Sequence, residues 1–177
     1  MRWSLRRATD ADADRIGEIT VAGWRHAYRG IVADDRLDAL DPAEVAERRR
    51  EVIAAPEPMA VFVAVSTAGD DQGRVRGYCT VGPSTDPDLA GDAGAKSGVL
   101  YTLYLDPEVI GTGAGSALHD AGVAHLAAAG FTRATLWVYT ANTHAQAFYA
   151  HRGWSPDGEP YQGPGWSAPA TRWALDL

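Results

Sequence analysis

Residues 103–116 read LYLDPEVIGTGAGS, an apolar, strand-like segment that passes through a glycine-rich turn into a helix. The strand is expected at Val99–Leu105, the turn holds Gly111, Gly113 and Gly115, and the helical pattern ends at Gly130. The first N–H groups of a helix have no partner within it, and the helix dipole favours negative charge there. Glycines also let an anion approach the backbone closely. The stretch therefore predicts a pyrophosphate-sized anion site, although glycines can also serve turn geometry alone.

Two familiar phosphate-binding turns do not fit these residues. A P-loop closes on Gly-Lys-Ser/Thr, whereas Gly115 is followed by Ser116 and Ala117. A Rossmann site needs glycines after an early strand and an acidic residue near the end of the next strand. Here the glycines come late, and the next strand ends at 137–139 in WVY without an acid.

Upstream of this stretch the pattern predicts two helices and three strands. Thr9 or Asp10 can cap the first helix, and Asp41-Pro42 followed by Glu44 is a capped start for the second. The expected elements are a strand at Leu5–Ala8, a helix whose apolar face includes Ile16, Ile19, Gly23 and Ala27, a helix from Asp41 to about Ala54, and hairpin strands at Ala60–Ser66 and Val75–Val81.

Downstream, a β-α-β unit in the second half of the chain completes the fold. The expected elements are a loop at Ser84–Gly98, the strand Val99–Leu105, a helix at Gly113–Ala129, a strand at Ala134–Tyr139, a helix at Thr143–Arg152, a loop at Tyr161–Pro169 and an edge strand at Thr171–Leu177. The helix between Val99–Leu105 and Ala134–Tyr139 makes these two strands parallel. The predicted fold is α/β (mixed α+β), with three layers and a mixed central sheet of six or seven strands between helices. No composition break divides the chain, so 1–177 is expected to be a single domain.

Composition excludes several classes of protein. The 177 residues carry a net charge of −7, which argues against nucleic acid as a partner. The longest apolar runs are too short to cross a bilayer, and the first seven residues lack the apolar core of a signal peptide. Cys79 is the only cysteine, so no internal disulfide can form, and we expect a cytoplasmic protein. His119 and His125 lie six apart, off one helical face, so no metal site is expected.

The order of four motifs resembles that of a known enzyme family. They are LYLDP at 103–107, the glycine turn, LWVYTAN at 136–142 and AQAFYAHRGW at 145–154. This order is similar to that of the bacterial GNAT N-acetyltransferases, and the strong resemblance covers Val99–Trp154. The segment WRHAYRG at 24–30 also looks like the first helix of one bacterial branch of that family.

The resemblance implies a GNAT-like fold, in which the two parallel strands splay around an acetyl-CoA site. It implies that the backbone of Leu103 and Leu105 binds the pantetheine arm and that Asn142 binds it too or orders the loop. Tyr149 would protonate the leaving thiolate, unless it is a core aromatic beside Phe148. The amides expected to hold the pyrophosphate are those of Gly111, Thr112, Gly113, Ala114, Gly115 and Ser116. The sequence departs from the family at Ile110 and Thr112, where basic or amide side chains are usual.

The resemblance also implies the reaction, direct attack of an amine on acetyl-CoA in a ternary complex. The acceptor would be a primary amine of a small molecule or peptide, and Trp24 and Tyr28 are the expected acceptor-side residues unless both only cover the core. Dimers are common in the family, so a homodimer is allowed. The alternative is a catalytically degenerate module that binds acyl-CoA as a sensor or structural ligand. The general base stays unassigned among Asp34, Asp35, Asp86, Glu159, His26 and His144.

Overall fold

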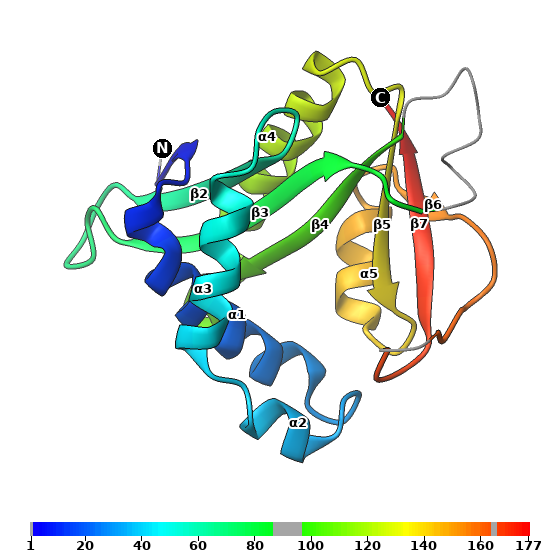
Figure 1. Cartoon of the computed structure of the whole chain (residues 1–177), viewed down its shortest axis with the longest axis horizontal. Helices are drawn as coiled ribbons and strands as arrows, with labels where there is room; N and C mark the ends of the chain where they lie inside the picture. The colour runs from blue at the N-terminus through cyan, green and yellow to red at the C-terminus, as the bar shows by residue number, and fades with distance from the viewer. Residues whose placement is uncertain (1, 87–96, 164–165) are drawn as a thin grey trace.

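The computed structural model describes residues 2–86, 97–163 and 166–177. Its described strands form one mixed, seven-stranded sheet in the order β1-β2-β3-β4-β5-β7-β6 (Figure 1). The strands are β1 Trp3–Arg7, β2 Ala60–Ser66, β3 Val75–Pro83, β4 Ser97–Leu105, β5 Arg133–Tyr139, β6 Ser155–Pro156 and β7 Ala170–Asp176. Only β4 and β5 run parallel, and all other neighbouring pairs are antiparallel. The predicted mixed sheet and its parallel pair are confirmed.

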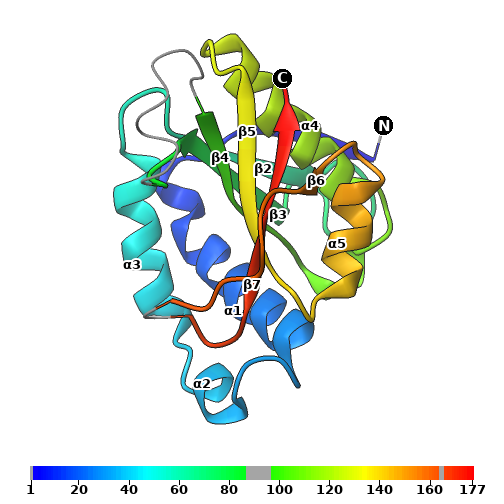
Figure 2. The same cartoon turned by 90° about the vertical axis from the view of Figure 1, so that its right-hand side faces the viewer.

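Helices cover both faces of this sheet (Figures 1 and 2). They are α1 Ala13–Tyr28, α2 Asp34–Asp38, α3 Pro42–Ile53, α4 Ala114–Ala128 and α5 Thr143–Ala150, with 3₁₀ turns η1 at Asp10–Asp12 and η2 at Pro107–Val109. The α1 face buries Ile16 and Ile19 against Val63 and Tyr78. The next residues along β2 and β3, Ala64 and Cys79, pack instead against α4, because alternate strand residues point to opposite faces.

Local sequence explains where α1 and α3 begin. Asp41 Oδ1 accepts a hydrogen bond of 2.8 Å from the N–H of Ala43, so Asp41 is the N-cap of α3, as predicted. Thr9 precedes the η1 turn, and its N–H donates to Asp12 Oδ2 at 2.8 Å. The chain thus enters α1 through a short 3₁₀ turn, and Thr9 caps that turn.

Three expectations about the elements need correction. The strand β7 is not at the edge of the sheet, because β6 pairs with it on the side away from β5. A two-residue strand such as β6 is too short to show a sequence period. The helix α2 was not expected at all; it spans five residues, little more than one turn. Ser97 and Gly98, predicted as the end of a loop, already belong to β4, while 87–96 of that loop lie outside the described residues.

The parallel pair is short, and this creates the opening in which the site lies. Pairing between β4 and β5 covers only Ser97–Val99 opposite Arg133–Thr135. Beyond these residues the two strands diverge, and Figure 1 shows the space between their ribbons widening. On its other side β4 stays paired with β3 as far as Leu105. One edge of β4 is therefore left without a strand partner from about Leu100 onward.

The helices α1 and α3 approach each other closely at Gly17. A Cβ atom at this position would lie 2.3 Å from the carbonyl oxygen of Pro42 and 3.2 Å from Cβ of Ala46. We predict that Gly17→Ala lowers the free energy of unfolding. The expected overpacking cost of about 1–3 kcal/mol exceeds the helix-propensity gain of about 1 kcal/mol from replacing glycine. Urea unfolding measures this change.

The matched control is Glu18→Ala, which places an alanine at the next, exposed position of the same helix. It should change the free energy of unfolding by less than about 1 kcal/mol, because Glu18 makes only a surface ion pair with Arg15. Equal effects of the two substitutions would contradict the close helix contact as the cause.

Candidate active site

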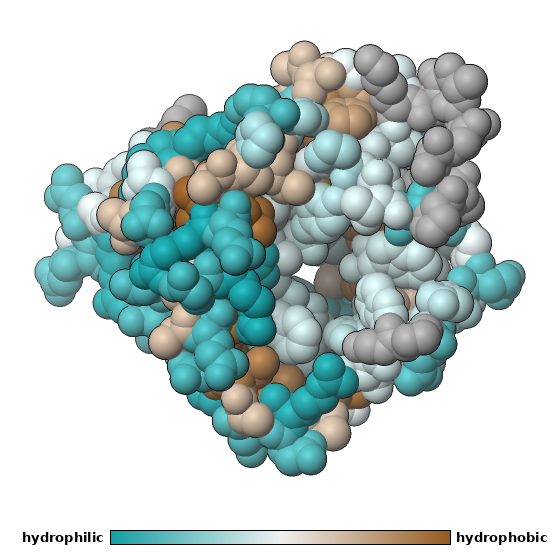
Figure 3. Space-filling view, viewed as in Figure 1, coloured by the Kyte–Doolittle hydropathy of each residue, from teal (hydrophilic) through white to brown (hydrophobic). Residues whose placement is uncertain are grey.

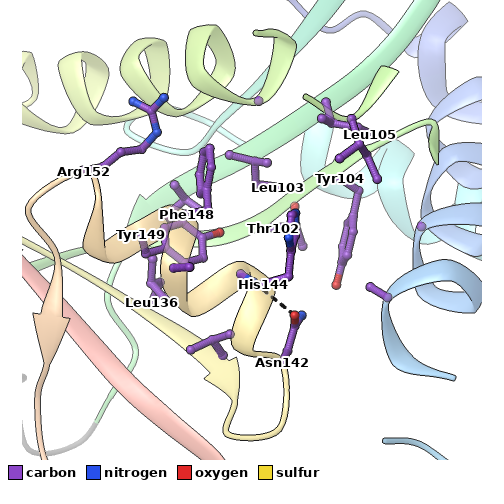
Figure 4. A pocket seen from close by; sticks show the side chains of 18 of the residues that line it. Thr102, Leu103, Tyr104, Leu105, Leu136, Asn142, His144, Phe148, Tyr149 and Arg152 are labelled. Atoms are coloured by element: carbon purple, nitrogen blue, oxygen red, sulfur yellow. Dashed lines mark hydrogen bonds between the residues drawn. The ribbon is translucent and has the colours of Figure 1, made fainter. Parts of the chain in front are cut away.

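A cavity of about 730 Å³ lies between the diverging halves of the sheet. Its lining comes from α1, β4, the glycine turn with the start of α4, β5, and α5 with the residues after it. Figure 3 shows the hollow near the middle of the face, bordered by residues of intermediate hydropathy, and Figure 4 shows it closely. The residues predicted from the sequence that do line it are Tyr28, Leu103, Leu105, Gly111, Gly113, Gly115, Ser116, Asn142 and Tyr149. Trp24, Thr112 and Ala114 do not belong to the lining.

The glycine turn adopts a backbone shape that explains its composition. Gly111 has φ +79° and Gly113 has φ +93°, in the left-handed region that strains other residues. Gly113 is the N-cap of α4, and the first turn of this helix contains no acidic residue. The start of α4 therefore presents its N–H groups and its positive dipole end without a local carboxylate.

Two residues of this turn serve the fold, which explains why they are absent from the lining. Thr112 Oγ1 donates to the carbonyl of Val109 at 2.6 Å, and the Thr112 carbonyl accepts from Trp3 Nε1 at 3.1 Å. Ala114 is fully buried against the α4 face of the sheet. Their backbone amides could still face a ligand, but the Thr112 hydroxyl is committed to closing the turn.

A basic side chain that the sequence analysis did not single out lies beside this turn. Arg152 follows α5, and its guanidinium donates to Ser116 Oγ in the first turn of α4. It stacks at 4.7 Å over the ring of Phe148, and one nitrogen lies 3.3 Å from Asp120 Oδ1 (Figure 4). Its Nε is buried and has no hydrogen-bond partner among the described residues. Arg152 thus brings a positive charge to the turn where Ile110 and Thr112 bring none.

Tyr149 lies deep in the cavity, with 9% of its surface exposed. Its ring contacts those of Phe148 and Trp154 at centroid distances of 5.2 and 5.9 Å. Burial raises the pKa of Tyr149 far above its usual value, so the phenol is neutral at physiological pH. The structure gives Tyr149 both of the environments considered from the sequence: it packs among core aromatics and it faces the cavity.

Behind Tyr149, a buried histidine links α4 to the end of α5. Trp154 Nε1 donates to His119 Nε2 at 2.8 Å, and because an indole only donates, Nε2 is the acceptor. The proton of the neutral ring is then on Nδ1, which lies 2.9 Å from Asp120 Oδ1. Burial lowers the pKa of His119, and the Asp120 carboxylate opposes this only in part.

Asn142 connects β5 to α5 at the wide end of the opening. Its Oδ1 accepts from the N–H of Ala145 at 3.1 Å, which makes Asn142 the N-cap of α5 (Figure 4). This bond fixes the start of α5, and the two roles considered for Asn142 toward acetyl-CoA stay predictions.

The two aromatic residues expected on the acceptor side are separated by the structure. Tyr28 lines the cavity, and its hydroxyl lies 3.1 Å from that of Tyr104. Trp24 is half-buried outside the lining, with its ring edge-on to Tyr28 at 5.1 Å. Both lie on one side of α1, as their four-residue spacing predicts. Only Tyr28, one turn further along the helix, reaches the opening.

None of the carboxylates considered as a base lines the cavity. Asp34 pairs with Arg29 at 3.1 Å, and Asp86 accepts from the indole N–H of Trp137 at 3.2 Å. His26 and His144 do belong to the lining. The described cavity wall therefore offers imidazoles but no carboxylate.

A mixed sheet that opens between two parallel strands, with a glycine-capped helix at one end of the opening, is the arrangement expected of a GNAT fold. A family model described as the acetyltransferase (GNAT) family matches residues 24–154, and the chain belongs to this family. The family and the fold predicted from the sequence are therefore confirmed.

Individual relatives show how similar this chain is to other acetyltransferases in sequence and in fold. A mycothiol acetyltransferase of Nocardioides sp. is 29% identical over 84% of this chain, which spans about half (48%) of that protein. The uncharacterized N-acetyltransferase YuaI of Bacillus subtilis is 30% identical over 78% of this chain and 73% of its own length. The crystal structure of the PaiA N-acetyltransferase of Thermoplasma acidophilum in complex with coenzyme A has a TM-score of 0.73. It is 18% identical, covering 97% of this chain and 98% of that one, so it shows the shared fold.

Across residues 2–86, 97–163 and 166–177, no helix has the length and apolar composition of a membrane span.

The buried His119 predicts a pH dependence of stability. Because its pKa is lower in the folded protein than the usual 6.5, the unfolded chain takes up this proton first. The free energy of unfolding should therefore fall as the pH drops below about 6.5, the usual histidine value. His119→Gln keeps an acceptor for Trp154 without titrating and should flatten this dependence. Urea unfolding between pH 5 and 7.5 measures both proteins, and equal slopes would contradict a buried neutral His119.

Proposed function

We propose that the chain is an acetyl-CoA-dependent N-acetyltransferase that acetylates a primary amine of a small molecule or peptide by direct attack in a ternary complex. The observation that carries this proposal is the unpaired edge of β4, which lines a cavity together with the glycine turn, Arg152 and Tyr149. Residues 1–177 would act as one domain. With Cys79 buried and no disulfide, the cytoplasm suits the chain.

The described residues offer groups that suit the separate parts of acetyl-CoA. The N–H groups at the start of α4, with Arg152 beside them, suit a pyrophosphate. The free edge of β4 around Leu103 and Leu105 offers backbone groups in an extended row, which suits the amide-containing pantetheine arm. Gly115 faces the same part of the cavity, where Leu105 and Phe148 are its neighbours.

When bound, acetyl-CoA supplies the reactive thioester. The backbone N–H groups of the open β4 edge would stabilise the negative charge that develops on the carbonyl oxygen. Tyr149 would donate its proton to the departing thiolate, and its raised pKa keeps that proton in place until then. The amine must attack in its neutral form, and its proton would leave by His26, His144 or water, since the described lining holds no carboxylate.

The second candidate, an acyl-CoA-binding module without transfer, rests on the unusual residues Ile110 and Thr112 in the turn. Arg152 weakens this alternative, because it supplies from α5 the charge that the turn itself lacks.

Tyr149→Phe tests the function and the proposed proton donor together. We predict that turnover, measured as thiol release from acetyl-CoA with a panel of amines, falls about 100-fold or more, because a general acid contributes at least that much. Affinity for CoA, measured by calorimetry, should stay unchanged.

Tyr78→Phe is the matched control, since it removes a buried hydroxyl bonded to Thr20 outside the cavity and should leave turnover intact. Full turnover of Tyr149→Phe would eliminate Tyr149 as the donor. If the unmodified protein binds CoA and no amine releases thiol, the binding module is the correct function.

Arg152 provides a test of the pyrophosphate end. We predict that Arg152→Leu weakens CoA about tenfold, as expected for the loss of one charge-assisted hydrogen bond. It should also make the affinity less sensitive to salt, because fewer charged contacts remain to be screened. Calorimetry at two ionic strengths measures both effects. Arg152→Lys should recover part of the affinity, whereas Arg50→Leu, on the exposed side of α3, should change nothing. Equal affinities of Arg152→Leu and the parent would contradict this assignment.

A further inference from the structure

The wall of the cavity that faces α1 is built from aromatic and small residues. From α1 it includes Gly23, His26 and Tyr28; Tyr104 comes from β4 and Trp137 from β5. In the ribbon view α1 and β5 lie on opposite sides of the opening (Figure 1). The acceptor side of the cavity therefore carries an aromatic ring from each half of the molecule.

This wall carries no negative charge among the described residues. The chain has 23 Asp and Glu residues, yet none of those described lines the cavity. Asp86, which contacts this wall from outside the lining, accepts a hydrogen bond from Trp137 and lies 3.6 Å from Arg172. Strongly hydrophilic residues, drawn teal in Figure 3, gather instead over the side of the molecule formed by α1 and α3. Among the described lining residues, the net charge of −7 therefore has no counterpart on the acceptor side.

This charge distribution disfavours polyamines and aminoglycosides. An acceptor with several ammonium groups would have to desolvate the ones that do not react, and each would need a carboxylate partner. The described wall offers none. An acceptor with one amino group, which loses its charge before it attacks, meets no such cost.

Two rings of the wall, Tyr28 and Trp137, are connected through further aromatic contacts. Tyr28, Tyr139, Trp166 and Trp137 form a continuous row, here called the aromatic row, with successive centroid distances of 5.0, 5.9 and 5.6 Å. These spacings are those of favourable aromatic pairs. The row joins α1 to β5, so it connects the two halves of the molecule on this face.

The polar atoms of Tyr28 and Trp137, two of the rings that line the cavity, are already bonded. The hydroxyl of Tyr28 lies 3.1 Å from that of Tyr104, and the indole N–H of Trp137 donates to Asp86. What Tyr28 and Trp137 offer to a ligand is therefore ring surface rather than hydrogen bonds. Preorganised apolar surface of this kind recognises flat, apolar groups at a low entropic cost.

We propose that the acceptor is an arylalkylamine, a single primary amine on a short chain attached to an aromatic ring, with the ring between Tyr28 and Trp137. This inference rests on the proposed transferase function. The neutral amine nitrogen forms a bond to the acetyl carbon, and the carbon–sulfur bond breaks. The thiolate takes the proton of Tyr149, which is restored by the proton that the nitrogen loses through solvent. The products are the N-acetylated amine and CoA.

The first experiment compares acceptors on the unmodified protein. Tryptamine and phenethylamine should show kcat/KM values at least tenfold above those of spermidine and kanamycin in the thiol-release assay. Calorimetry in the absence of acetyl-CoA should also detect tryptamine binding and no binding of spermidine. Preference for spermidine or kanamycin would overturn the inference and leave the transferase function intact. CoA binding without thiol release from any amine would remove both.

The second experiment tests the two rings. Tyr28→Leu and Trp137→Leu should each raise KM for tryptamine about tenfold and lower its preference over isoamylamine, an amine without a ring. Phe131→Leu is the matched control, because it removes a half-buried ring after α4 that is not part of the lining. Thermal unfolding verifies that each variant is folded. If one of the two ring variants does not fold, the other still provides the test. An unchanged tryptamine preference in a folded Tyr28→Leu protein would overturn the inference.

Discussion

The rest of the structure depends on how early the pairing between β4 and β5 ends. The two strands pair at Ser97–Val99 and Arg133–Thr135. There α4 lies close to the sheet: a Cβ at Gly98 would be 2.7 Å from a Leu126 methyl group. The α4 crossover thus holds the strands together at one end, and their divergence beyond it opens the cavity. If β4 were paired along its whole length, its backbone N–H and C=O groups would all be bonded within the sheet. None would then be left to bind a ligand.

An opening of this kind weakens the sheet, and other contacts bridge it. On the α1 face the rings of Tyr28 and Tyr139 meet at 5.0 Å. On the α4 face, Arg152 reaches from the end of α5 to Ser116, and Trp154 donates to His119. The residues that hold the two halves together are thus the same residues that line the cavity or lie directly behind it. Changes to the site should therefore alter stability as well as binding.

The two faces of the opening differ in chemistry. The α4 face offers unpaired helix N–H groups and a guanidinium, which favour an anion. The α1 face offers ring surface whose polar atoms are already bonded. A phenol kept neutral by burial, that of Tyr149, lies between them. This separation places an anionic cosubstrate and an apolar acceptor on opposite sides of one strand edge, which suits the ternary complex of the proposed reaction.

Local patterns in the sequence were sufficient to predict most helices and strands, the parallel pair, the glycine turn and the family. Each of these predictions rests on short runs of residues and on their order along the chain. Gly111 and Gly113 reveal their turn, and Asp41 reveals the start of α3, without knowledge of any partner. Only the tertiary structure decided that Arg152 serves the turn 36 residues earlier, that Trp24 stays outside the cavity while Tyr28 lines it, and that β7 is interior. These outcomes depend on contacts between distant segments, and no local period encodes which side chain reaches across a gap that exists only once the sheet has formed.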